Sequence, residues 1–293
     1  MILFAKRNLK LFFRDKSAVF FSLLAVLIVI GLYAFFLGDQ LVSGFESVDG
    51  VKVEGARFIM DSWLIAGILA VTSISTTLGA FGIIVDDKVK KIDKDFRCSP
   101  IPRSSIAGGY IISSFVIGVI MSVIAFAVGE LYIVASGGEI LPFESIIKVL
   151  GMILLTVLAG SSMMFFVVSF FKSTNAFATA STVIGTLIGF ITGIYLPIGS
   201  MDDSVATIVK IFPISHAASI FRKIFMEVPL EQSFENIPTQ FSDSIKTTIN
   251  DELGVNFTIG SWEVSTLDSI LILIATSILF YVLGIAVISR KKK

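Results

Sequence analysis

Residues 86–105, DDKVKKIDKDFRCSPIPRSS, form a charged island between two long apolar runs. The island carries four lysines and two arginines, interleaved with four aspartates. A basic loop between hydrophobic spans stays on the cytoplasmic side of a membrane, because Lys and Arg close to a span resist translocation. The island therefore predicts a cytoplasmic loop that fixes the orientation of the spans on either side.

The same island has an apolar pattern of helical period. Three apolar side chains are spaced at i, i+3 and i+7, which predicts a short helix with one narrow apolar stripe, ended by two prolines. An amphipathic helix held between two spans is suited to docking a soluble partner; the alternative is a solvated loop that only sets topology. The residues expected to contact a partner are Val89, Lys90, Ile92, Asp93 and Phe96.

The composition excludes an ordinary soluble domain. Hydrophobic residues make up 55% of the 293 residues and charged residues only 16%, with a mean hydropathy of +0.90. Several apolar runs are long enough to cross the ~30 Å of a bilayer's hydrocarbon, and the alternating period of a membrane barrel is absent. We predict an all-α membrane protein, a single transmembrane domain over residues 1–293, with spans at 17–37, 62–85, 106–128, 146–171, 176–196 and 267–289.

The segments outside the spans have their own patterns. Residues 1–16, MILFAKRNLKLFFRDK, mix basic and apolar positions as interfacial helices do. The second span contains VTSISTTLGAFG, whose hydroxyls can bond to carbonyls of their own helix. Residues 200–266 form a long polar region with an apolar island at 206–225 that Pro213 breaks. That island predicts re-entrant helices before the last span, covered by protein where they enter the bilayer.

Charge asymmetry orients the spans. The proposed inner segments, which are both termini, the central loop and Lys172, hold 16 of the 23 Lys and Arg residues, whereas the outer segments hold 18 of the 23 Asp and Glu residues. Positive charge marks the cytoplasmic side. We therefore expect both termini, the central loop and the lone cysteine Cys98 to be cytoplasmic.

The ionisable residues argue against several kinds of site. The predicted spans carry no charged residue or His in their middle, and Glu130 comes closest, near the outer end of the third span. Ion-coupled carriers usually place such groups at mid-depth. The only histidine, His216, is expected to be a packed side chain rather than a ligand. We expect no catalytic residue, no metal and no cofactor, and because no G-x-x-x-x-G-K-[ST] loop occurs, energy for active transport would come from another polypeptide.

Gly185, Gly189 and Gly193 are spaced four apart on the predicted fifth span. This spacing favours a groove on one helix face that permits close helix approach. The groove is either ordinary packing within one subunit or the lining of a dimer interface and a substrate path.

The chain resembles the membrane subunit of ABC-2-type transporters. The resemblance is carried by the basic segment AKRNLKLFFRDK running into the first span, by IVDDKVKKIDKDFRCSPIPRSS between the second and third spans, and by GIYLPIGSM followed by IFPISHAASIFRKIF. It extends over essentially the whole chain. Residues 226–265 form a longer outer region than the compact members have.

The resemblance implies six spans, an N-terminal interfacial helix, a coupling helix between spans 2 and 3, and re-entrant helices before span 6. It implies a bacterial plasma-membrane exporter with two permease subunits, alike or different, and two ATP-binding subunits, moving a drug, lipid, peptide or glycan, with the lipid bilayer but no nucleic acid as a further partner. A membrane scaffold or sensor whose outer segment binds a ligand is the alternative, and a secondary carrier is disfavoured by the missing charges within the spans.

Overall fold

The computed structural model describes residues 1–45, 47–48, 51–235 and 237–290, and about 82% of the structure is helical. Its helices are α1 (Ile2–Arg14), α2 (Lys16–Leu32), a π-helical turn (Tyr33–Leu37), α3 (Gly38–Phe45), α4 (Ala56–Val89), α5 (Ile92–Cys98), α6 (Arg103–Ala135), α7 (Phe143–Val168), α8 (Thr174–Ile191), a 3-10 turn (Ile198–Ser200), α9 (Asp203–Ile211), α10 (Pro213–Ser233), α11 (Thr239–Glu252) and α12 (Thr266–Arg290). Two antiparallel hairpins pair β1 (Ser47–Val48) with β2 (Val51–Lys52), and β3 (Phe257–Ile259) with β4 (Trp262–Val264).

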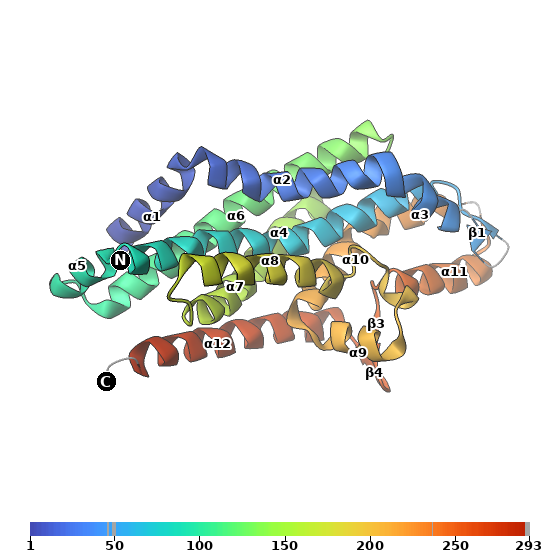
Figure 1. The fold of residues 1–293 in the computed structure, drawn as a ribbon. Helices are drawn as coiled ribbons and strands as arrows, with labels where there is room; N and C mark the ends of the chain where they lie inside the picture. Colours follow the sequence, from blue (N-terminus) through green and yellow to red (C-terminus); the bar gives the residue numbers. More distant parts are fainter. Residues whose placement is uncertain (46, 49–50, 236, 291–293) are drawn as a thin grey trace.

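Six helical stretches within the described residues are long and apolar enough to cross a membrane, and the prediction of an all-α membrane protein is confirmed. The first stretch joins α2, the π-helical turn and α3, and the other five correspond to α4, α6, α7, α8 and α12. In Figure 1, α1, α5 and the last turns of α12 lie at one end of the molecule, whereas α11 and both hairpins lie at the other. An even number of spans would place α1 and the last turns of α12 at the same end of the molecule, as observed.

Helix α4 lies at the centre of the bundle and packs against α6, α7, α8 and α10. Of its most apolar stretch, 72% is buried, against 11% for α8. Helix α4 is therefore the interior element of the bundle, and α8 leaves most of its surface uncovered.

The hydroxyl-rich part of α4 behaves as its sequence predicts. Thr72, Ser73, Ser75, Thr76 and Thr77 each donate a hydrogen bond to the carbonyl four residues earlier, at 2.5–3.0 Å. These donors therefore need no water, which hydrocarbon cannot supply. The small side chains also let α6 approach, because a Cβ added at Gly118 would lie 2.7 Å from Thr77.

Helices α9 and α10 meet at an angle of 90°. The break falls at Pro213, which is the first residue of α10 and lacks the N–H that an unbroken helix would need. The predicted interruption of the 206–225 island at this proline is confirmed by the helix bounds. Helix α10 then runs beside α4, α7 and α12.

The fifth span ends earlier than predicted. Helix α8 stops at Ile191 rather than 196, because Gly193 adopts a left-handed φ of 67°. The N–H of Ile194 bonds to the Gly189 carbonyl at 3.1 Å, and the N–H of Gly193 bonds to Phe190 at 3.0 Å, which closes the helix end. Pro197 comes after the chain has already turned.

A buried arginine covers this helix end. The Arg222 Nη2 of α10 donates to the carbonyls of Thr192 and Gly193 at 2.7 and 3.1 Å, and its guanidinium lies 5.0 Å from the ring centroid of Trp63 in α4. Carbonyls at a helix C-terminus carry partial negative charge, so a cation there is stabilising. Arg222 thereby ties α8, α10 and α4 together.

Trp63 also joins α4 to the end of α11, because its indole Nε1 donates to the buried Leu253 carbonyl at 2.9 Å. We expect Trp63→Phe to lower the thermal stability of the purified protein, since a buried acceptor without its donor costs about 1–3 kcal/mol. Thermal stability is measured by size-exclusion chromatography, as the fraction of protein that stays monodisperse after heating. Trp262→Phe is the control because Trp262 is exposed. Equal melting shifts for the two variants would contradict the assigned role of Trp63.

Candidate functional site

The charged island folds as two segments rather than one helix. Helix α4 continues through Val89, Lys91 adopts a left-handed φ of 62°, and α5 begins at Ile92. The prediction that Val89 shares a helix with Ile92 and Phe96 is therefore wrong. A left-handed non-glycine residue reverses the chain direction locally, so the i, i+3, i+7 spacing does not produce one face here.

The predicted partner-contact residues differ in exposure. Val89 and Lys90 are exposed at the end of α4, whereas Ile92, Asp93 and Phe96 are half-buried in α5. Phe96 is half-buried because its ring packs edge-on against Phe4 of α1, with the ring centroids 4.9 Å apart. Lys94 and Asp95 of α5 are exposed, and Phe96 anchors α5 to α1.

An ion pair lies directly beneath this aromatic contact. Arg7 of α1 donates through both terminal nitrogens to the two carboxylate oxygens of Asp87, at 2.7 and 2.8 Å. The Asp87 side chain is only 4% exposed and that of Arg7 is 30% exposed. The hydrogen bond to Asp87 raises the pKa of the Arg7 guanidinium further above its usual value. The Arg7 guanidinium also lies 5.1 Å from the centroid of the Phe96 ring.

Helix α6 completes this junction. The Tyr110 hydroxyl donates to Asp87 at 2.5 Å, and its ring packs against Phe4 with the centroids 4.9 Å apart. One turn further along α1, the fully buried Asn8 donates to Ser113 at 3.2 Å. We call Phe4, Arg7, Asp87, Phe96 and Tyr110 the cytoplasmic junction, because they join α1, α4, α5 and α6 at the end of the molecule predicted to be cytoplasmic.

Sequence reasoning missed this junction. Asp86 and Asp87 are adjacent and identical, yet Asp86 is exposed and pairs with Lys90 at 3.5 Å, whereas Asp87 is buried. Nothing in the sequence distinguished them, because the partner Arg7 lies 80 residues away. Tyr110, just inside the third span, is the signal that was available, since a buried phenol needs a hydrogen-bond partner.

The three glycines of the fifth span do not form one groove. Gly193 lies beyond the end of α8, so the prediction that all three share a helix face is wrong. Gly189 is covered by the ring of Tyr195, to which an added Cβ would come within 2.1 Å. Gly185 alone faces open space, with nothing within 4 Å of an added Cβ.

A cavity of about 250 Å³ lies beside Gly185, between α2, α4 and α8. Its wall combines apolar side chains with hydroxyl groups, among them Ser22, Thr72 and Thr182. The Thr72 and Thr182 hydroxyls donate to carbonyls of their own helices, which leaves their lone pairs as acceptors. The cavity therefore suits a ligand that is mostly apolar and carries a few donors. We call it the span cavity.

Three further buried ionisable groups each have a hydrogen-bond partner. Asp61, near the outer end of α4, accepts from Arg57 and from the Tyr132 hydroxyl. Glu130 accepts from the Leu141 N–H at 3.0 Å, and the ring nitrogen of His216 bonds to Ser269 at 3.1 Å. The prediction that His216 is a packed side chain is confirmed. Among the described residues, no cluster of His, Cys, Asp and Glu is placed to hold a metal ion.

The two neighbouring aspartates provide a matched test of the junction. Asp87→Asn removes the charge that holds Arg7, at a cost of roughly 2 kcal/mol once the partial exposure of Arg7 is allowed for. We expect α1 to open more often, so trypsin should cleave at Lys6, Arg7 and Lys10 faster than in the wild type. Asp86→Asn should leave the rate unchanged. Equal cleavage rates in the two variants would mean that the ion pair does not hold α1.

A search of curated proteins finds no match for this chain. The profile of the family described as "ABC-2 family transporter protein" matches residues 53–286, which is most of the chain and includes α4 to α12 except the last residues of α12. The match agrees with the apolar helices of the bundle. The chain therefore belongs to the ABC-2 transporter family and is a multi-pass membrane permease of an ABC transporter.

Proposed function

We propose that this permease is half of the membrane part of an ATP-driven exporter, acting with a second permease subunit and two ATP-binding subunits. The family match carries the proposal, because permeases of this family generally work with an ATP-binding subunit and are not themselves catalytic. The protein would lie in the bacterial plasma membrane with both termini in the cytoplasm. The excess of Lys and Arg in the predicted inner segments supports this orientation.

In this proposal α5 is the coupling helix. Support comes from its position between α4 and α6 and from its exposed Lys94 and Asp95, which follow the exposed Val89 and Lys90. Helix α1 would lie in the membrane interface, held there by the cytoplasmic junction. A push on α5 would pass through Phe96 to α1, and through Asp87 to α4.

The substrate path would run along α8 and include the span cavity. Helix α8 leaves most of its surface uncovered, as expected of a helix that faces a second subunit across a shared path. The apolar and hydroxyl lining of the cavity favours a hydrophobic or amphipathic substrate moved outward. The bent pair of α9 and α10 would be the re-entrant helices that close the outer side of this path.

The exposed Val89 and the half-buried Ile92 should both be needed for binding of the ATP-binding subunit. We expect the double variant Val89→Glu, Ile92→Ala to lose most of the co-purifying ATP-binding subunit, since interface contacts of this kind are worth ~2 kcal/mol or more. Mass spectrometry identifies that subunit by its G-x-x-x-x-G-K-[ST] loop. Phe170→Ala alters an exposed apolar residue in the α7–α8 turn and serves as the control. Equal recovery of the ATPase with both variants would remove α5 as the coupling helix.

The glycine beside the span cavity allows the path to be tested. Gly185→Leu should fill part of the cavity and abolish ATP-dependent uptake of amphipathic dyes into inverted vesicles, in which an exporter pumps inward, while expression persists because lipid tolerates Leu. Gly79→Leu adds the same bulk to α4 at a site with nothing within 4 Å of an added Cβ and outside the cavity lining. It should transport normally. Export by Gly185→Leu at the wild-type rate would exclude the span cavity from the path.

A further inference from the structure

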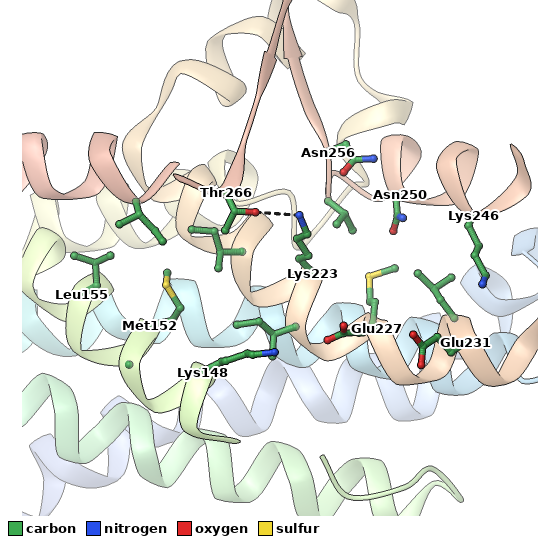
Figure 2. A pocket seen from close by; sticks show the side chains of 17 residues that line it. Lys148, Met152, Leu155, Lys223, Glu227, Glu231, Lys246, Asn250, Asn256 and Thr266 are labelled. Carbon is green, nitrogen blue, oxygen red and sulfur yellow. Dashed lines mark hydrogen bonds between the residues drawn. The ribbon is translucent and has the colours of Figure 1, made fainter. Parts of the chain in front are cut away.

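A larger cavity opens at the opposite end of the molecule from the cytoplasmic junction. It has a volume of about 740 Å³ and is bounded by α7, α10, α11 and the start of α12 (Figure 2). Cavities of this size hold small organic molecules. We call it the outer groove, because it lies in the segment predicted to face outward.

One part of the outer groove is apolar. Met152 and Leu155 of α7 face Ile220 and Ile224 of α10 and Ile270 of α12. Leu155 lies about 10 Å deeper along the axis of α7 than Lys148, at ~1.5 Å per residue. We call these apolar residues the floor of the groove. The floor extends from the charged rim along α7 and α12, so the groove has a polar end and an apolar end.

Charges of both signs form the rim. Glu227 and Glu231 lie on successive turns of α10, and three lysines surround them. Figure 2 shows Lys148 extending from α7 toward Glu227. Lys246 extends from α11, and its Nζ lies 5.9 Å from the centroid of the Phe234 ring. The third, Lys223, donates to Thr266 at 3.0 Å, and Lys148 also pairs with Glu144 at 2.8 Å.

The rim also holds a hydrogen-bond acceptor that lacks a donor. Asn250 Oδ1 is buried in the groove wall and has no hydrogen-bond partner among the described residues. Burying such an atom is unfavourable unless a donor reaches it. A bound ammonium or hydroxyl group would supply one.

We propose that the outer groove binds one zwitterionic phospholipid, with its phosphate against the lysines, its ammonium against Glu227 and Glu231, and an acyl chain on the apolar floor. An anionic lipid would offer no cationic group to the two glutamates, and a cationic amphipath would offer no anionic group to the lysines. A zwitterion matches both signs. The apolar floor accounts for the chain, which a free headgroup lacks.

Native mass spectrometry of the purified full-length protein tests this site without ATP or transport, so its failure would leave the proposed function untouched. The probes are dioleoyl phosphatidylethanolamine and dioleoyl phosphatidylglycerol, added in equal amounts. The wild type should bind the zwitterionic lipid preferentially. Glu227→Gln with Glu231→Gln should shift the ratio toward the anionic lipid by about tenfold. Glu263→Gln, an exposed position on β4, should not.

A second pair of variants tests the floor. Leu155→Trp should reduce binding of the zwitterionic lipid, whereas Leu158→Trp, at an exposed position on the same helix and outside the groove, should retain it. Equal retention would place the lipid in the detergent layer and overturn the proposal, as would an unchanged lipid ratio in the glutamine double variant. Soluble phosphoethanolamine should not compete. Full competition by it would overturn the assignment to a lipid.

Discussion

The ion pair between Arg7 and Asp87 joins two segments that lie 80 residues apart in the chain. Helix α1 is amphipathic and could lie on any apolar surface, but the paired guanidinium and carboxylate fix it against the end of α4. Tyr110 joins α6 to this pair through its hydrogen bond to Asp87, and Phe96 joins α5 to α1 through its contact with Phe4. Breaking a buried, hydrogen-bonded ion pair costs more than forming it gains, because the remaining charge stays desolvated. The main effect of the ion pair is therefore to make α1 and α4 move together.

Helix α4 connects this ion pair, near its C-terminal end, to the opposite end of the bundle. Its 34 residues span about 51 Å, and the five hydroxyls between Thr72 and Thr77 donate within the helix. Near its other end Trp63 contacts Arg222, which covers the C-terminus of α8 beside the span cavity. In the proposed mechanism, displacement of α5 by an ATP-binding subunit reaches the substrate path by this route. The outer groove lies on α7, α10, α11 and α12, and it shares α10 with that line of contacts.

The sequence was sufficient for the features that depend on local composition. Apolar runs predicted six spans, and the hydroxyls of the second span bond within α4 as expected. Pro213 marked the break between α9 and α10. Local patterns failed where a single backbone angle decided the outcome: Lys91 separates Val89 from α5, and Gly193 ends α8 early. Both residues adopt a left-handed conformation that hydropathy and spacing do not encode.

The candidate site was less predictable than the fold, because its residues meet across long stretches of sequence. The basic positions of the first segment were read as an interfacial pattern, yet Arg7 is distinguished from Lys6 and Lys10 only by the position of Asp87. Gly189 was expected to pack against another helix, and it instead receives Tyr195 from the turn that Gly193 creates. In each case the contact depends on tertiary structure.

In the proposed mechanism, the Arg7–Asp87 pair transmits the action of the ATP-binding subunits to the membrane spans. The most direct test exchanges the charges. ATP-driven dye export by the reconstituted complex should fall in Arg7→Asp and in Asp87→Arg, because each variant places like charges together, and should recover in the double variant that restores an ion pair. Recovery of export in the double variant is the predicted result. Export that is no better in the double variant than in either single one, with the complex still assembled, would show that the ion pair does not transmit this action.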